Sequence, residues 1–554
     1  MTDSHIPSNA DRQDVLRLAR GGLLNLVGAA SFGLLGFALT VVISRTLSST
    51  DVGIFFEFVA LYTFGVTLAN LGTSVGLMRA VARARSLNRV ADLRPLLGLS
   101  LAPTFAAGCV VGLLGFAFAS DLAGLFLDAP HRDVAASYFR VAAPTVPFAA
   151  VLMGIVAATR GFGNMLPFNV IENIGQPSVR LMLSIGLFFG LANSWYPALI
   201  WAGPSVLALL VAVLWLHSLL GKASRRSVPS VVARRAVLAR EFWSFTSMRF
   251  GASVLEVLLA WMGVLLLGAL KSAEEAGVFA AASRYLLAGM LVNAAVFGVI
   301  GPHLGELLAV GDRRRVRVVY QTATMWVILI TLPVYLMMAV FAPVLMGIFG
   351  AHFTSGADAL VILVLGMLVT MVAGPMSALL LMGGRSSWNL FNTVAALVVN
   401  IALSVVLIPL LGTTGAAISF AGTSIVLNGL LVTQGLLLWR IHPAGPQYGH
   451  AIVAAAVCFG VIPLGLRLVL GATPGTLVLA GLIGVTLFTA YVRRHRHAFR
   501  LPSTAELVSG KLGVDGGSAL LLRVGSETAV AGRGRRAQSR MTLRAALRRV
   551  GIGR

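Results

Sequence analysis

The chain has 554 residues, of which 57% are hydrophobic and only 11% are charged, and its mean hydropathy is +0.88. Soluble globular chains carry about 25% charged residues, so the composition excludes a soluble enzyme, a disordered chain and a disulfide scaffold. The net charge of +23 has two readings. One is that the protein binds nucleic acid. The other is that the basic residues mark cytoplasmic loops and lie against anionic lipids of a membrane.

Fourteen apolar runs approach the roughly 20 residues that a helix needs to cross a bilayer. The first follows a polar start and is not followed by a small-residue cleavage site, so we expect it to be retained rather than removed as a signal peptide. The sequence therefore predicts an all-α polytopic membrane protein with about 14 transmembrane helices. The expected spans are 21–43, 52–78, 96–119, 138–158, 166–191, 197–219, 242–269, 277–300, 320–346, 358–382, 388–411, 415–439, 451–470 and 475–492.

Basic residues gather in alternate loops between these spans. One side of the membrane would receive the basic clusters within 12–20, 79–94, 222–240, 313–317 and 493–500, together with Arg160, Arg385 and Arg440. The opposite loops hold mainly acidic residues, among them Asp51, Asp121, Asp133, Glu274 and Glu275. Because positive residues mark the cytoplasmic side, we expect a multi-pass protein of the plasma (inner) membrane with both termini cytoplasmic. Nucleic acid is then not needed as a partner.

Two strips of the sequence repeat at nearly one spacing. The strip Leu47–Phe55 is similar to Leu270–Phe279, and within them Gly53 and Gly277 lie 224 positions apart. The strip from Arg160 to Asn169 is similar to that from Arg385 to Asn392, where the two asparagines lie 223 positions apart. Because an even number of spans separates the copies, the halves should be parallel repeats, with a substrate cleft between them.

The repeat and the charge pattern give the expected domain boundaries. The C-terminal tail is rich in Gly and Ser, lacks a long apolar run and has a strong positive charge, so we expect it to be largely disordered. Its end, from Met541, either lies as a basic amphipathic helix on anionic lipids of the inner leaflet or is a solvated tail without a partner. The expected segments are a cytoplasmic N-terminal segment (1–20), an N-lobe (21–220), a basic cytoplasmic linker (221–241), a C-lobe (242–440), two further helices (441–492) and the basic tail (493–554).

Two stretches carry a resemblance to a known family, SRTLSSTDVGIFFEF at 44–58 and LMGGRSSWNLFNTVAALVVNIALSVVLIPLLGTTGAAISFAGT at 381–423. Both are similar to Wzx-type oligosaccharide flippases, relatives of lipid II flippases and, more distantly, of multidrug and toxin extrusion antiporters. The resemblance covers roughly residues 15–490. It implies two facing six-helix bundles, sometimes with two added helices. It also implies transport of a polyprenyl-diphosphate-linked oligosaccharide to the outer leaflet, with a polysaccharide polymerase or glycosyltransferases as candidate partners.

Polar residues inside apolar spans are candidate substrate-binding residues, because a charge near the bilayer centre costs several kcal/mol. The span 242–269 carries Arg249 and Glu256, seven positions apart and hence on one helix face. Arg284 lies near the outer end of the next span, where it either faces the mouth of the cavity or snorkels to the outer headgroups. Glu57 is expected at an interfacial position. The span 166–191 holds the largest set, Asn169, Glu172, Asn173, Gln176 and Arg180.

Guanidinium groups pair bidentately with phosphate oxygens, so Arg180 and Arg249 are predicted to meet the diphosphate of the substrate. Sugar hydroxyls would be bound by the neighbouring amides, Asn169, Asn173 and Gln176. The alternative is that Glu172 forms a buried ion bridge with Arg180 or with the helix of 242–269, which would hold helices together and bind nothing.

The sequence has no phosphate-binding loop with its lysine and no metal-ligand or catalytic cluster, so the chain is expected to be neither an enzyme nor a cofactor protein. Transport would be driven by an ion gradient, the membrane potential or consumption of the product. Two other functions stay open. A cation-coupled multidrug exporter requires acidic residues in its cavity, and the intramembrane set here is mixed in sign. A membrane scaffold would recruit glycosyltransferases through the basic tail.

Overall fold

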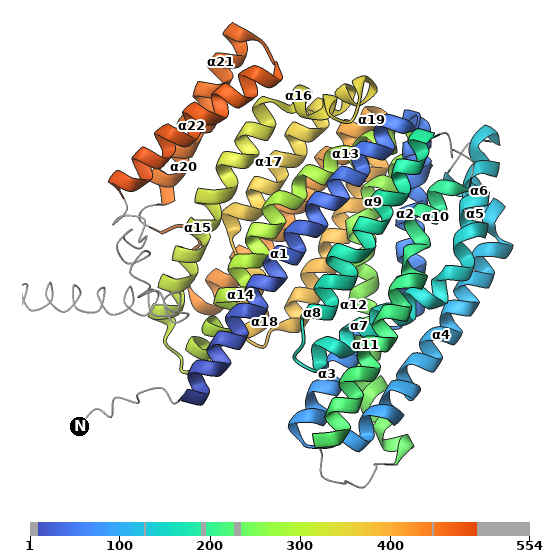
Figure 1. Cartoon of the computed structure of the whole chain (residues 1–554). Helices are drawn as coiled ribbons and strands as arrows, with labels where there is room; N and C mark the ends of the chain where they lie inside the picture. Colours follow the sequence, from blue (N-terminus) through green and yellow to red (C-terminus); the bar gives the residue numbers. More distant parts are fainter. Residues whose placement is uncertain (1–8, 127–128, 190–194, 227–233, 446–447, 496–554) are drawn as a thin grey trace, which may run out of the picture.

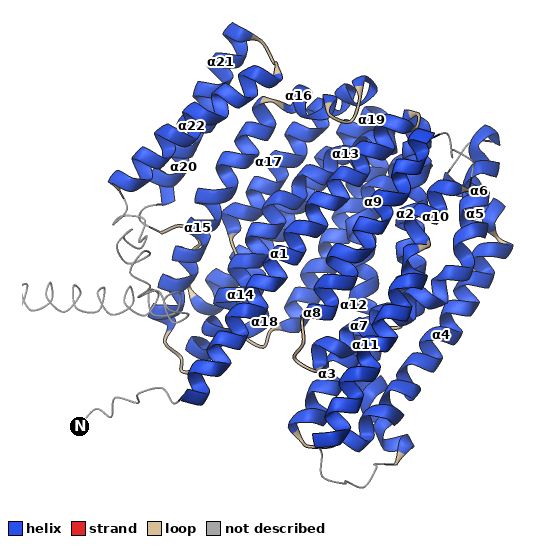
Figure 2. Ribbon diagram, viewed as in Figure 1, coloured by secondary structure: helices blue, strands red, loops and turns tan. Residues whose placement is uncertain are grey.

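The computed structural model describes residues 9–126, 129–189, 195–226, 234–445 and 448–495 (Figure 1). Within these ranges the backbone forms helices, turns and loops and no strand (Figure 2). The first half contains α1 (Asn9–Thr46), α2 (Ser49–Asn70), α3 (Thr73–Ser86), α4 (Leu93–Ala117), α5 (Ala119–Phe126), α6 (Ala129–Ala142), α7 (Val146–Gly161), α8 (Leu166–Phe168), η3 (Asn169–Gly175), α9 (Gln176–Ile185), α10 (Tyr196–Ala202) and α11 (Pro204–Arg226).

The second half of the described chain begins at Arg235 and ends at Arg494. Short 3-10 turns precede several helices, among them η1 (Val90–Asp92) and η5 (Arg284–Leu286). The longer elements are α12 (Arg235–Leu270), α13 (Ala273–Ser283), α14 (Leu287–Ala309), α15 (Arg313–Val340), α16 (Ala342–Gly347), α17 (Ala357–Ala373), α18 (Met376–Met382), α19 (Ser386–Trp439), α20 (Tyr448–Ala456), η7 (Val457–Val461), α21 (Ile462–Leu470) and α22 (Pro474–Arg494).

Twelve helices of the described chain are long and apolar enough to cross a membrane. One of them, α19, contains a break at Gly412, whose φ of 55° is left-handed, and this break falls between the predicted spans 388–411 and 415–439. The stretch from Leu166 to Phe189 is not among the twelve and is interrupted by the π-helical η3. The predicted all-α polytopic membrane fold is confirmed, and the expected number of 14 crossings is approximate.

The two helices that carry the first sequence repeat begin with the same cap. Ser48 accepts a hydrogen bond from the backbone N–H of Asp51 (3.1 Å) at the start of α2, and Ser272 accepts one from that of Glu275 (3.3 Å) at the start of α13. A side-chain oxygen at this position satisfies one of the free N–H groups of the first turn. The similar sequences of the two strips therefore encode the same helix start in both halves.

The repeated glycines lie where α2 and α13 cross. A Cβ added at Gly53 would overlap the carbonyl oxygen of Ala273, and one added at Gly277 would lie 2.8 Å from the Gly53 nitrogen. Only residues without a side chain allow the two backbones to approach this closely. Beside the crossing, the Ser49 hydroxyl donates to the Glu274 carboxylate (3.1 Å). The pseudo-symmetric halves are thus joined through the residues that define their repeat.

The first helix of each half contacts both halves. Helix α1 lies against α9 and η3 of its own half and against α14 of the other, while α12 lies against α13 and α19 as well as α2 and α3. In Figure 1 the helices of the two halves meet toward the upper edge, near α2 and α13, and separate toward the lower edge, where α3 and the start of α1 lie. Helices α20 to α22 flank α15 on the outside of the bundle.

The observed helix ends differ from the expected domain boundaries. Helix α1 begins at Asn9, inside the expected segment 1–20, and the linker 221–241 is shortened because α11 continues to Arg226 and α12 begins at Arg235. The expected tail lies outside the described residues from position 496 onward. The boundaries of the two lobes therefore stay a prediction.

Candidate functional site

The span predicted over 166–191 is built from three elements, α8, η3 and α9. Prolines stand near the start of α8 (Pro167) and of α9 (Pro177), and seven of the nine residues between these prolines form the π-helical η3. Proline lacks the N–H that continues an α-helical ladder, and π-helical turns are frequent at functional sites. The wider turn changes which side chains share a face, so a regular helical spacing does not describe this segment.

Two of the predicted amide ligands lie in a helix contact. The Asn173 side chain donates to the Asn169 side chain (2.8 Å), which in turn donates to the Met165 carbonyl (3.1 Å). Asn169 is 3% exposed, and a Cβ added at Gly28 of α1 would overlap its oxygen. These two amides therefore reach a ligand only when α1 moves away from η3.

Arg180 joins α9 to α10. Its Nε donates to the Trp201 carbonyl (3.1 Å), its Nη2 donates to Gln176 (3.4 Å), and its guanidinium carbon lies 3.9 Å from the centre of the Trp201 ring. Glu172 lies within electrostatic reach of Arg160 and Arg180, but it forms no ion pair within 4.0 Å with either among the described residues. The guanidinium of Arg180 is held by an aromatic ring and not by a carboxylate.

Arg249 and Glu256 lie on one face of α12, as their spacing predicts. Arg249 Nη2 and Glu256 Oε1 are 3.9 Å apart, and the side chains are 38% and 61% exposed. A carboxylate exposed in the middle of an apolar helix is costly against lipid, so this face of α12 is expected to border water.

Arg284 lies between helices and has no acidic partner in the described chain. Its guanidinium carbon is 4.8 Å from the centre of the Phe56 ring of α2 and 5.6 Å from that of Trp261 of α12. Its Nε is buried and has no hydrogen-bond partner. The aromatic partners of Arg284 and Arg180 were not identified from the sequence, since each comes from another helix and its ring gives no distinguishing signal.

The interfacial depth of Glu57 stays a prediction, but its side chain is covered by a neighbouring helix. Its side chain is 2% exposed, both carboxylate oxygens are buried without a hydrogen-bond partner, and a Cβ added at Gly268 of α12 would overlap the carboxylate. The depth of a residue along its own helix predicts how near it lies to the headgroups, but not which neighbouring helix covers it. Here α12 crosses α2 at this position and excludes water.

No group of three metal-ligating side chains occurs within the described ranges. The charged residues that the sequence predicted as ligands fall into two sets. Arg180 and Glu172 lie in the first half, whereas Arg249, Glu256 and Arg284 lie on or beside α12.

Comparisons with known proteins identify both fold and family. Among solved structures, the lipid II flippase MurJ in an inward closed conformation is similar with a TM-score of 0.66 at 13% identity, covering 86% of this chain and 99% of MurJ. An inward-facing multidrug resistance MATE family transporter of the MOP superfamily gives 0.61 at 16% identity, covering 75% and 98%. A MOP superfamily transporter from Pyrococcus furiosus, described as having a binding pocket of reverse polarity, gives 0.56 at 18% identity, covering 76% and 94%.

No curated protein matches the sequence. These structural similarities establish the fold of the chain, because their sequence identities are low. The sequence profile of the polysaccharide biosynthesis protein family matches residues 18–308, which is more than half of the chain. With its many membrane-spanning helices, this chain belongs to the polysaccharide biosynthesis protein family.

Proposed function

We propose that this protein is a flippase that moves a polyprenyl-diphosphate-linked oligosaccharide from the cytoplasmic to the outer leaflet of the plasma (inner) membrane. The observation that carries the proposal is that three intramembrane arginines have no close carboxylate partner. Arg180 and Arg284 contact aromatic rings and Arg249 has only a loose carboxylate contact. Guanidinium groups without close carboxylate partners are suited to bind the diphosphate of a lipid carrier.

Arg249 is the residue that we expect to bind the diphosphate first. Its side chain is 38% exposed although it lies in an apolar helix, and Glu256 lies at the edge of ion-pair distance, 3.9 Å away. An incoming diphosphate would replace Glu256 at the guanidinium and gain two parallel hydrogen bonds. Gln176 and Arg180 would bind the sugar or diphosphate from the opposite half, and Asn169 and Asn173 would join them once α1 has moved.

Alternating access follows from the contacts of the two halves. The crossing of α2 and α13 closes the end of the bundle that we assign to the outer face, whereas the basic ends of α3 and α15 separate on the face that we assign to the cytoplasm. With both termini on that cytoplasmic face, the basic tail would lie near anionic lipids of the inner leaflet. The flipped product would pass to a polysaccharide polymerase or glycosyltransferase. The chain would act as a transporter without catalysis.

The direct test is the inventory of lipid-linked glycans in the two leaflets of cells depleted of this protein. We expect one polyprenyl-diphosphate oligosaccharide to accumulate on the cytoplasmic side, because its synthesis continues while its transfer stops. An unchanged inventory would refute the flippase proposal.

The second candidate is a cation-coupled multidrug exporter, and Glu57 is the observation that favours it. A buried carboxylate without partners is the kind of group that binds a coupling cation or proton. The MATE transporters among the similar structures share the fold.

Replacing Glu57 with methionine tests both the stability of the protein and the two candidate functions. We expect the free energy of unfolding to rise by about 1 kcal/mol or more, because an unpaired buried carboxylate is replaced by an apolar chain of similar length. Thermal unfolding of the purified protein measures this change. The control is Glu241→Met, which removes an exposed carboxylate that is ion-paired with Arg83 and is expected not to raise the free energy of unfolding. A flippase without coupling at this site keeps its transport rate in Glu57→Met, whereas a coupled exporter loses its dependence on the cation gradient.

A further inference from the structure

A cavity lies at the ends of α3, α7 and α11, on the face that we assign to the cytoplasm. Its volume is about 680 Å³, within the usual size of ligand sites. Each of the three helices contributes one cation, Arg85, Arg160 and Lys222. No described residue of the lining carries a carboxylate, and the short chain between α11 and α12 (227–233) contains no acidic residue.

The two arginines of this cavity make few polar contacts with the rest of the protein. Arg85 lies 5.4 Å from the centre of the Phe162 ring and makes one long hydrogen bond, to the Gly161 carbonyl (3.5 Å). Arg160 lies 4.4 Å from the centre of the Phe168 ring, and its buried Nε has no hydrogen-bond partner. Glu172 acts on Arg160 electrostatically but does not line the cavity. The cavity therefore concentrates positive charge that the protein itself does not neutralise.

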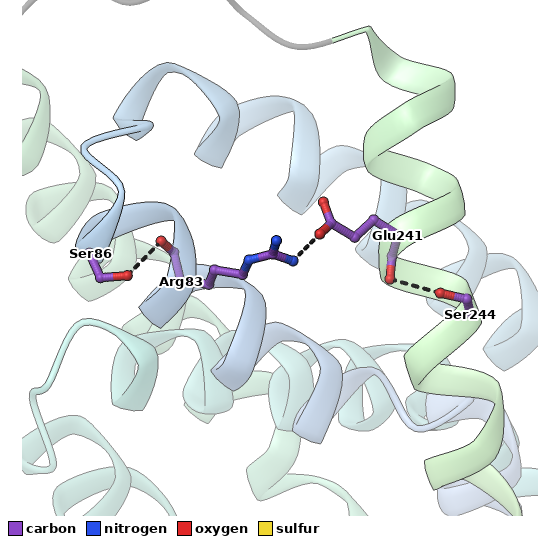
Figure 3. A network of polar contacts seen from close by, with 4 residues as sticks. All are labelled: Arg83, Ser86, Glu241 and Ser244. Carbon is purple, nitrogen blue, oxygen red and sulfur yellow. Dashed lines mark hydrogen bonds and ion pairs between the residues drawn. The ribbon is translucent and has the colours of Figure 1, made fainter.

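In a neighbouring cavity between α3 and α12, by contrast, carboxylates lie beside the basic side chains. It is lined by Arg79, Arg83 and Arg89, but also by Asp92 and Glu241. Arg83 forms an ion pair with Glu241 (Figure 3). The Ser86 hydroxyl donates to the backbone carbonyl of Arg83, and the Ser244 hydroxyl donates to that of Glu241. Two carboxylates thus offset most of the positive charge there.

We propose that the cavity lined by Arg85, Arg160 and Lys222 binds a phosphate group. Arginine forks and a lysine ammonium from three helices together offer the donors that phosphate oxygens require. The phosphate belongs either to the headgroup of a bilayer phospholipid or to a soluble phosphate compound, since both present the same oxygens. The lining of this cavity includes none of the candidate residues for the flipped lipid.

The test uses the full-length protein in a detergent without phosphate, dodecyl maltoside. One arm measures binding of inorganic pyrophosphate by calorimetry, and the other measures retention of added phosphatidylglycerol by native mass spectrometry. The variant Arg85→Ala/Lys222→Ala removes two exposed cations and is expected to weaken binding at least tenfold. The matched control is Arg79→Ala, which removes an exposed cation of the same helix that lines the neighbouring cavity, and it is expected to bind as the wild type does.

The two arms distinguish the sources of the phosphate. Loss of phosphatidylglycerol retention identifies a lipid headgroup, and loss of pyrophosphate binding identifies a soluble ligand. Thermal unfolding of each variant, with the single variant Lys222→Ala as the milder change, separates lost binding from lost folding. Equal binding of both probes by wild type and folded double variant, or an equal loss in Arg79→Ala, would overturn the proposal.

Discussion

Arg249→Ala is expected to reduce the transport of lipid-linked oligosaccharide about tenfold to a hundredfold. The substitution removes a guanidinium that would hold the diphosphate through charge-assisted hydrogen bonds. Such bonds contribute about 1.5–3 kcal/mol each, and 1.4 kcal/mol corresponds to tenfold in an equilibrium constant. The measurement is the rate at which the labelled lipid-linked glycan becomes accessible on the outer side of proteoliposomes, at equal protein content.

Three further variants make this prediction specific. Arg249→Lys keeps the charge without the planar fork and should recover part of the rate. Glu256→Gln removes the loose carboxylate partner and should retain transport, because the guanidinium then stays free for the substrate. The matched control is Arg235→Ala at the start of the same helix, which is expected to transport normally. Normal transport by Arg249→Ala would remove this residue from the binding site, and loss of transport only in Glu256→Gln would favour a cation-coupled exporter.

The sequence predicts best what depends on local pattern. The apolar runs predict the membrane helices, and the glycine at position 412 falls in the short interval between two expected spans. The repeat at Gly53 and Gly277 predicts related halves, and the two glycines do meet at a crossing of helices. Matching helix starts at Ser48 and Ser272 explain why these strips resemble each other.

What the sequence does not predict depends on contacts between distant segments. The π-helical turn of η3 shifts the faces of the side chains, so the spacing of Asn169 and Asn173 gave no indication that they lie against Gly28 of α1. For Arg284 the sequence offered two positions, and its aromatic contacts come from α2 and α12. The sequence did not predict that Glu57 is covered, because the covering helix follows about two hundred positions later in the chain.

Gly53→Ala is expected to open the crossing of α2 and α13 and to reduce transport at least tenfold. The added methyl group would overlap the backbone carbonyl of Ala273, which cannot turn aside as a side chain does. Overpacking of this kind costs about 1–3 kcal/mol. Because the crossing exists in the state that is closed at this end, the penalty falls on that state and shifts the population away from it.

Disulfide cross-linking measures the crossing directly. The Ser49 hydroxyl and the Glu274 carboxylate are 3.1 Å apart. Once Cys109 and Cys458 have been replaced by alanine, cysteines at both positions are therefore expected to be joined by a short bis-methanethiosulfonate, which bridges two thiols through reducible disulfides. Cross-linking should stop transport and reduction should restore it, since opening of this end requires α2 and α13 to separate. Adding Gly53→Ala should lower the yield of cross-linked protein severalfold.

The control for this substitution is Gly36→Ala in α1, where an added Cβ meets no atom within 4 Å. It changes the same residue type in a membrane helix without touching the crossing, so the cross-linking yield and the transport rate should both be preserved. Transport that continues in the fully cross-linked protein would show that α2 and α13 stay together throughout the cycle. The proposal that their crossing is the outer gate would then be wrong, while the assignment of Arg249 to the substrate would still stand or fall by its own variants.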